Sequence, residues 1–305
     1  MNDIFSTQDL IEGKLSALTP PARLAVMGDP VAHSKSPDFH NAALQAAGIE
    51  ARYVKIHVKP EEFPTALRAL PEAGFFGTNV TIPHKATALA GVDEADDYAQ
   101  QSGAVNTVVV DGDRLCGFNT DGPGLLRAIR EEFSVDLRDL RVMLLGAGGG
   151  AGRAIAVQCA MENCERLVLV NRTVSKAQSL AEELSSRFRS DRLLGPVDRL
   201  QAIPLEVDRL REQLAFTDLV INATSLGMKR SDPPLLPPGL LTANLMVYDT
   251  VYATGASRLL EDAAAAGARV ANGLSMLLHQ GALSFEIWFN RPAPLSVMRT
   301  ALHPA

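Results

Sequence analysis

Lys85 and Asp121 are the residues of this chain whose types best suit proton transfer. Each lies in a compact polar segment, NVTIPHK at 79–85 and GFNTD at 117–121, and a third such segment, GAVNT, occupies 103–107. An isolated lysine is usually a solvated surface residue. A lysine beside a carboxylate, however, can pass a proton to a carbonyl that becomes an alcohol. The pattern predicts a proton-transfer pair acting on a small polar substrate.

A glycine-rich segment, GAGGGAG at 146–152, follows an apolar stretch typical of a buried strand and precedes a predicted helix. Such glycines let the backbone approach a pyrophosphate, which then lies at the positive N-terminus of the helix. Glycine-rich stretches also form flexible turns, but the strand before and the helix after favour a cofactor loop. Together with the acid–base pair, the loop predicts hydride transfer coupled to proton transfer.

The next predicted strand ends in Asn171, Arg172 and Thr173, and Lys176 follows. NAD sites usually place a carboxylate near this point, where it binds the ribose 2′-hydroxyl. Here the arginine, threonine and lysine offer charge and hydrogen bonds to a 2′-phosphate instead. A solvated basic helix start would have the same composition. We predict NADP rather than NAD as the cofactor.

Two serines, Ser34 and Ser36 in HSKSP at 33–37, precede a predicted helix. Their hydroxyls and the helix N-terminus can bind a substrate carboxylate without a dedicated arginine. A Ser-x-Ser-Pro sequence alone is more often a helix cap. Asp121 could likewise cap a helix beginning at Gly122, but we expect it chiefly to orient Lys85 and a substrate hydroxyl.

Composition bounds the class of protein. The 305 residues favour two domains, and the net charge of −6 argues against nucleic acid as the main partner. No apolar run approaches the roughly 18 residues of a membrane span. The three cysteines lack metal-ligand spacing, so no metal is expected. Residues 1–21 lack a signal-like apolar core and are interpreted as a short extension of a cytoplasmic protein.

Short apolar strands alternate with helical stretches along the chain, which indicates an α/β fold. We predict a substrate domain with a mixed βα sheet at 1–122, completed by a C-terminal helical part at 273–305. A Rossmann-like, doubly wound parallel-sheet domain is predicted at 123–272, with a cleft between the two. The polar segment 190–214 is interpreted as an insertion between sheet elements.

The chain resembles the shikimate dehydrogenase family over about residues 23–290. The resemblance rests, in order along the chain, on the polar segments, the glycine loop, NRT at 171–173, NATS at 222–225 and the stretch 273–280. The resemblance implies that Lys85 and Asp121 are the catalytic pair. It implies a substrate site formed by Ser34, Ser36, Thr81, Asn106, Asp121, Tyr252 and Gln280. It implies an NADP site formed by Asp97, Gly146, Ala147, Gly148, Gly149, Gly150, Asn171, Arg172, Thr173, Lys176, Thr250, Gly273 and Met276.

The activity implied by the resemblance is reversible reduction of 3-dehydroshikimate to shikimate by NADPH, in aromatic amino acid biosynthesis, by a monomer or homodimer. A catabolic quinate/shikimate dehydrogenase and a non-catalytic NADP-binding regulator on the same fold are the alternatives. The regulator would need neither Lys85 nor Asp121. The glycine loop is one glycine longer than is common in the family, and Thr250 stands where methionine is common.

Overall fold

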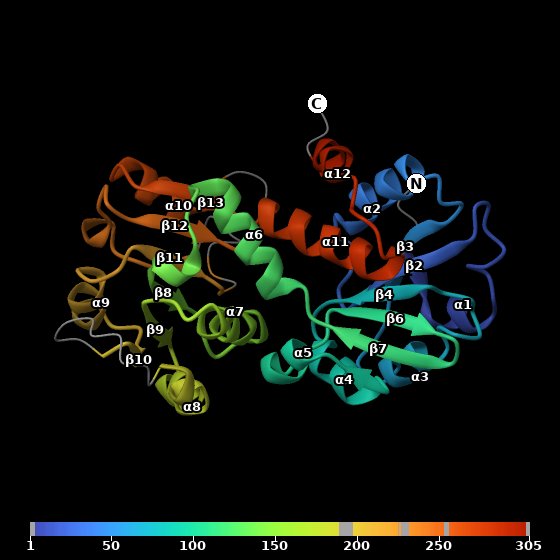
Figure 1. The fold of residues 1–305 in the computed structure, drawn as a ribbon, viewed down its shortest axis with the longest axis horizontal. Coiled ribbons are helices and arrows are strands. Elements are labelled where there is room, and N and C mark those ends of the chain that lie inside the picture. The colour runs from blue at the N-terminus through green and yellow to red at the C-terminus, as the bar shows by residue number, and fades with distance from the viewer. Residues whose placement is uncertain (1–3, 189–197, 225, 227–231, 253–255, 303–305) are drawn as a thin grey trace. The chain divides into compact units, whose positions relative to one another are not determined.

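The computed structural model describes residues 4–188, 198–224, 226, 232–252 and 256–302 (Figure 1). The chain divides into two compact units. The first comprises Met1–Gly124 and Leu277–Ala305, and the second comprises Leu125–Met276. Helices and strands alternate in both units, which confirms the predicted α/β class.

A seven-stranded mixed sheet forms the centre of the first unit. Its strands β1, β3, β2 and β4 run parallel, whereas β6 is antiparallel to both β4 and β7. Strands β6 and β7 form a hairpin around Gly112. In spatial order the strands are β1 (Ile4–Ser6), β3 (Arg52–His57), β2 (Ala22–Gly28), β4 (Gly77–Val80), β6 (Thr107–Asp111), β7 (Arg114–Phe118) and β5 (Glu94–Ala95).

The N-terminal stretch is part of this sheet, which corrects its interpretation as a mere extension. Residues 4–6 pair in parallel with Lys55–His57 at the sheet edge, and α1 (Thr7–Ile11) follows with a capping box formed by Ser6 and Asp9. Leu10 and Leu15 are buried in the core of the unit. The stretch therefore covers one edge of β3 and contributes apolar burial.

Helices cover both faces of the first sheet. On one face, α2 (Ser36–Ala46), α12 (Leu295–Leu302) and the part of α11 (Leu274–Phe289) from Leu277 onward pack around Tyr53 and Phe39. On the other face, α1, α3 (Phe63–Arg68) and α4 (Lys85–Gly91) enclose a second core with Ile56 and Phe63. The helix α5 (Asp97–Ser102) contributes Ala99 to that second core. Strand β3, between these two layers, is therefore buried on both faces.

The second unit holds a six-stranded, wholly parallel sheet, which confirms the predicted doubly wound domain type. Numbered from its first strand, the order is 3-2-1-4-5-6, that of dinucleotide-binding folds. In spatial order the strands are β10 (Leu200–Pro204), β9 (Arg166–Asn171), β8 (Arg141–Leu145), β11 (Leu219–Asn222), β12 (Met246–Asp249) and β13 (Arg269–Asn272). Its helices are α6 (Asp121–Phe133) from Leu125 onward, α7 (Gly150–Met161), α8 (Val174–Leu184), α9 (Val207–Leu214) and α10 (Arg258–Ala265).

The interpretation of 190–214 as an insertion is wrong for its described part. Residues 200–204 form the edge strand β10, and 207–214 form helix α9, which buries Leu210 and Leu214. These are regular βα elements of the sheet. Residues 189–197 lie outside the described part of the chain.

None of the helices in the described ranges is both long and apolar enough to cross a membrane.

Candidate active site

The structure brings Lys85 and Asp121 into direct contact. Lys85 is the first residue of α4, and Asp121 is the first residue of α6. The pairing of Asn79 with Thr107, and of Thr107 with Phe118, places β4 and β7, the strands before these two helices, on either side of β6. Lys85 Nζ donates a hydrogen bond to Asp121 Oδ2 at 2.6 Å, and the two side chains are 24% and 9% exposed. A solvent-accessible ammonium is thus held by a nearly buried carboxylate.

Asn106 holds the other oxygen of Asp121. Its Nδ2 donates to Asp121 Oδ1 at 2.9 Å, while its Oδ1 accepts from the backbone N–H of Thr120 at 2.8 Å. A backbone N–H can only donate, so the Thr120 contact fixes which end of the Asn106 amide faces the carboxylate. Both oxygens of Asp121 therefore accept hydrogen bonds, as an ionised carboxylate requires. Asn106 supports the pair in addition to its predicted substrate role.

A buried polar cluster lies next to this pair and was not predicted from the sequence. The Nδ2 of Asn79 donates to Ser284 Oγ at 2.9 Å and to Thr107 Oγ1 at 3.1 Å. Ser284 and Thr107 hydroxyls are 2.8 Å apart, and Thr107 reaches the Oδ1 of Asn106 at 3.0 Å. The Tyr53 hydroxyl completes the cluster by donating to Asn79 Oδ1 at 2.8 Å. Fully paired buried networks rigidify their surroundings, so the cluster fixes the amide that holds Asp121.

Residues 29–36, here called the serine loop, connect β2 to the start of α2. Ser36 is buried as the first residue of the helix, and Ser34 Oγ accepts from the backbone N–H of Ser36 at 3.3 Å. Lys35 occupies the N-cap position and makes no side-chain cap bond. Neither serine is therefore at the capping position. Both remain candidates for binding a carboxylate.

Close packing places the other two predicted substrate residues of this unit. A Cβ on Gly28 would lie 2.3 Å from Thr81 Cγ2, so the threonine requires glycine on the neighbouring strand. A Cβ on Gly124 would lie 2.8–2.9 Å from atoms of Gln280, which allows α11 to meet the first turn of α6. Gln280 of α11 therefore packs against Gly124, which lies about one helical turn after Asp121 on α6. The remaining substrate candidate of the resemblance, Tyr252, belongs to the second unit.

His84 and Asp97 have simpler surroundings. The Nε2 of His84 lies 2.7 Å from the carbonyl of Val58, and its ring stacks on Phe63. Burial lowers the pKa of His84. These contacts give it a packing role. Asp97, predicted to line the cofactor, is an exposed residue at the start of α5.

The glycine loop has the geometry of a phosphate-binding turn. Gly146 adopts a φ of 88°, which favours glycine. A Cβ on Gly152 would lie 2.2 Å from Gly146 O, and a Cβ on Gly148 would lie 2.8 Å from Asn171 Nδ2. Helix α7 begins at Gly150 without a side-chain cap, so its first N–H groups stay available to an anion. The loop residues Ala147 and Gly149 complete the turn.

The residues predicted to select NADP follow β9. Asn171 ends that strand, and its Nδ2 donates to Thr173 O at 2.9 Å, which holds the turn leading into α8. Arg172, Thr173 and Lys176 are exposed beside this turn. Their charges and hydroxyl are therefore accessible to a phosphate.

A second buried polar group shapes the loop after β12. Asp249 Oδ1 accepts from Asn222 Nδ2 at 2.9 Å and from the backbone N–H of Val251 at 3.0 Å. Burial raises the pKa of this carboxyl. A Cβ on Gly273 would lie 2.1 Å from Thr250 O, so the chain before α11 contacts this loop closely.

Two further predicted residues belong to the same region. Met276 is buried, and its N–H donates to the Tyr248 hydroxyl at 3.0 Å. Tyr252, two residues beyond Thr250, is partly buried, and desolvation raises its pKa. Of the NATS motif, Asn222 and Thr224 are described and hydrogen-bonded to each other, while Ser225 lies outside the described residues.

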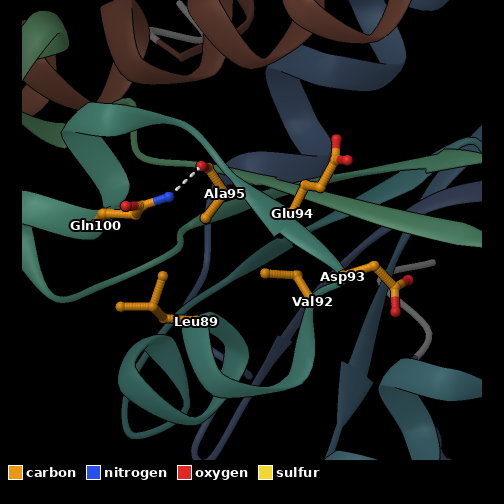
Figure 2. Close-up of a pocket in the computed structure, with 6 residues that line it drawn as sticks. All are labelled: Leu89, Val92, Asp93, Glu94, Ala95 and Gln100. Atoms are coloured by element: carbon orange, nitrogen blue, oxygen red, sulfur yellow. Dashed lines mark hydrogen bonds between the residues drawn. The ribbon is translucent and has the colours of Figure 1, made fainter.

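A hollow of about 440 Å³ in the first unit does not belong to this site (Figure 2). It is lined by Leu89, Val92, Asp93, Glu94, Ala95 and Gln100, none of which is a predicted site residue. Its two acidic groups are paired with arginines, Asp93 with Arg68 and Glu94 with Arg114. Within the described ranges, no group of three or more His, Cys, Asp or Glu could hold a metal ion.

Three segments of the chain match models of one family. Residues 26–108 match the shikimate dehydrogenase substrate binding domain, 127–228 match shikimate/quinate 5-dehydrogenase, and 273–303 match the shikimate 5′-dehydrogenase C-terminal domain. Shikimate dehydrogenase (NADP(+)) of Methanopyrus kandleri is 41% identical over 281 residues, which cover 92% of this chain and 94% of that protein. This chain belongs to the shikimate dehydrogenase family.

Solved structures of shikimate dehydrogenases have the same fold. The Thermus thermophilus enzyme in complex with NADP(H) and shikimate is 38% identical, with a TM-score of 0.80 over 92% of this chain and 98% of that one. A further relative, shikimate dehydrogenase (NADP(+)) of Symbiobacterium thermophilum, is 43% identical over 91% of this chain and 92% of its own length. The family assignment therefore covers both units.

Proposed function

We propose that this chain is a shikimate dehydrogenase that reversibly reduces 3-dehydroshikimate to shikimate with NADPH, a step of aromatic amino acid biosynthesis. The observation that carries the proposal is the Lys85–Asp121 pair, 2.6 Å apart and held by Asn106. A protein that only sensed NADP would need no such acid–base pair. We also propose that it acts in the cytoplasm, as a monomer or homodimer, on this small-molecule substrate.

The residues of the second unit fit NADP. The loop 146–150 is open around Gly150, where an added Cβ would meet nothing within 4 Å, and α7 offers uncapped N–H groups to a pyrophosphate. Arg172, Thr173 and Lys176 would hold the 2′-phosphate. We propose that Thr250, Gly273 and Met276 also line the NADP site. The bound cofactor supplies the hydride.

The proposed substrate roles are those that the family resemblance implies, and the hydrogen bonds among Lys85, Asp121 and Asn106 support the first of them. Lys85 gives a proton to the carbonyl oxygen as it becomes an alcohol, and takes it back in the reverse direction. Asp121 keeps the ammonium in place, and Asn106 fixes Asp121. Ser34 and Ser36 bind the substrate carboxylate. Thr81, Asn106 and Gln280 contact the ring hydroxyls, with Tyr252 as a further substrate contact. Asp97 is proposed to line the NADP side.

A steady-state assay tests the function directly. Shikimate and quinate are each offered with NADP⁺ and with NAD⁺, and kcat/KM is measured for the four pairs. We expect shikimate with NADP⁺ to be the best pair. If quinate with NAD⁺ gives the highest kcat/KM, the protein is instead a catabolic quinate dehydrogenase.

The cofactor preference has its own test. Arg172→Ala should raise the KM for NADPH by about 10–100-fold, because a charge-assisted hydrogen bond contributes about 1.5–3 kcal/mol. The KM for NADH should change less than about threefold. Arg209→Ala, which removes another exposed arginine of the same unit, is the matched control. Equal losses for NADPH and NADH would show that Arg172 does not recognise the phosphate.

A further inference from the structure

Lys55 is a buried lysine of the first unit that has no role in the site described above. It lies on β3 and is only 4% exposed. Its Nζ donates to Ala32 O at 2.7 Å, and no carboxylate of the described residues forms an ion pair with it. A buried charge is normally paired with an opposite charge, because removing it from water is costly. The missing partner requires an explanation.

The side chains next to Lys55 show which part of the molecule its charge faces. Side chains alternate along a strand, so Tyr53, Lys55 and His57 point to one face of β3. The Tyr53 hydroxyl donates a hydrogen bond to Asn79 in the polar cluster. Burial raises the pKa of Tyr53, and the side chain of Ser36, in the serine loop, partly offsets that rise. Ala32, the hydrogen-bond partner of Lys55, precedes Ser34 in the loop between β2 and α2. Lys55 therefore faces the serine loop.

The carboxylate of that loop is already engaged elsewhere. Asp29 Oδ1 lies 2.8 Å from the Nε2 of His57, the next residue along the same face of β3. The serine hydroxyls of the loop are neutral, so they cannot balance a positive charge. An anionic ligand bound at Ser34 and Ser36 would bring negative charge to the loop that Lys55 faces.

We propose that Lys55 is a specificity-determining residue that favours an anionic substrate at the Ser34–Ser36 loop by its charge. The proposal rests on the proposed function and deepens it, since it names the charge that balances the substrate carboxylate. It adds a lysine to the expectation that the serines and a helix N-terminus bind the carboxylate without a dedicated arginine. Lys55 acts through its charge and takes no part in proton transfer.

The test compares shikimate with its carboxamide, which is neutral and nearly the same size. Each is measured as a substrate or, where it is not turned over, as a competitive inhibitor. Lys55→Met, which keeps much of the side-chain length, should weaken the interaction with shikimate about tenfold and with the carboxamide less than about twofold. The KM for NADPH should stay the same. Lys55→Arg should retain most of the preference for the anion.

The controls separate charge from structure. Lys59→Met removes an exposed lysine four residues along the chain and should change neither ligand. If Lys55→Met is unstable in thermal unfolding, Lys55→Gln is measured in the same way. Equal weakening for shikimate and the carboxamide, or no weakening for either, overturns the inference. Failure of the wild-type protein to turn over shikimate would instead refute the proposed function, and the binding comparison would still decide the role of Lys55.

Discussion

Replacing Lys85 with alanine should lower kcat for shikimate oxidation by about 10²–10⁴-fold, the usual contribution of a positioned acid–base group. The KM for shikimate should change by no more than about tenfold, ~1.4 kcal/mol, because the proposed carboxylate and hydroxyl contacts remain. Steady-state kinetics in both directions measure the two quantities. Lys59→Ala, at an exposed position of the same unit, is the matched control. An unchanged kcat in Lys85→Ala would remove this lysine from the chemistry.

Asp121→Asn then shows how the pair shares the work. This change keeps the size of the side chain and removes its negative charge. If Lys85 alone is the acid, the loss in kcat should be much smaller than in Lys85→Ala. If the two act as one coupled unit, each single variant should lose about as much as the double variant Lys85→Ala/Asp121→Asn. Additive losses in the double variant would mean that the two residues contribute independently.

The contact between Lys85 and Asp121 could be predicted from the sequence. Lys85 and Asp121 are the last residues of two polar segments, and β6 pairs with the strands that precede both helices. The orientation of Asn106 could not be predicted, because it depends on which backbone N–H its amide oxygen meets. Here that donor is Thr120, and only coordinates reveal the bond.

The sequence also did not predict several contacts between distant parts of the chain. Ser284 lies in a mostly apolar helical stretch, and nothing in the adjacent sequence indicates that its hydroxyl will contact Asn79 and Thr107. The sequence does not indicate that Lys55 is buried, because alternation in a strand normally turns charged residues to solvent. The helices on both faces of β3, and the pairing of β1 at its edge, bury this lysine instead.

The misinterpretation of 190–214 has a different cause. Strand β10 is an edge strand whose residues are mostly only partly buried, so it lacks the continuous apolar run of the central strands. By contrast, β8 is fully apolar after its first residue, and the apolar stretch before the glycine-rich segment predicted a buried strand there. Strands are therefore predictable where the sheet buries both faces and ambiguous where it ends.

Gly152→Ala should disrupt the cofactor loop more than any other single methyl group added to it. The new Cβ would lie 2.2 Å from Gly146 O and 2.9–3.0 Å from further backbone atoms of Gly146 and Ala147. Backbone atoms cannot rotate away as a side chain can, so the turn itself must move. Because the proposed pyrophosphate contacts depend on that turn, NADPH binding should weaken by at least about a hundredfold, roughly 2.7 kcal/mol.

The same substitution should also destabilise the protein without cofactor. Overpacking of a tight contact costs about 1–3 kcal/mol, and a unit of this size loses about 2–4 °C in Tm for each kcal/mol. Gly150→Ala is the control for stability, since its Cβ would meet nothing within 4 Å at a helix start. It should leave the unfolding midpoint of the cofactor-free protein within about 1–2 °C. If both variants unfold at the wild-type temperature, the close approach of Gly152 to Gly146 does not constrain the loop. NADPH binding by Gly152→Ala at wild-type affinity would then separate the cofactor site from this turn.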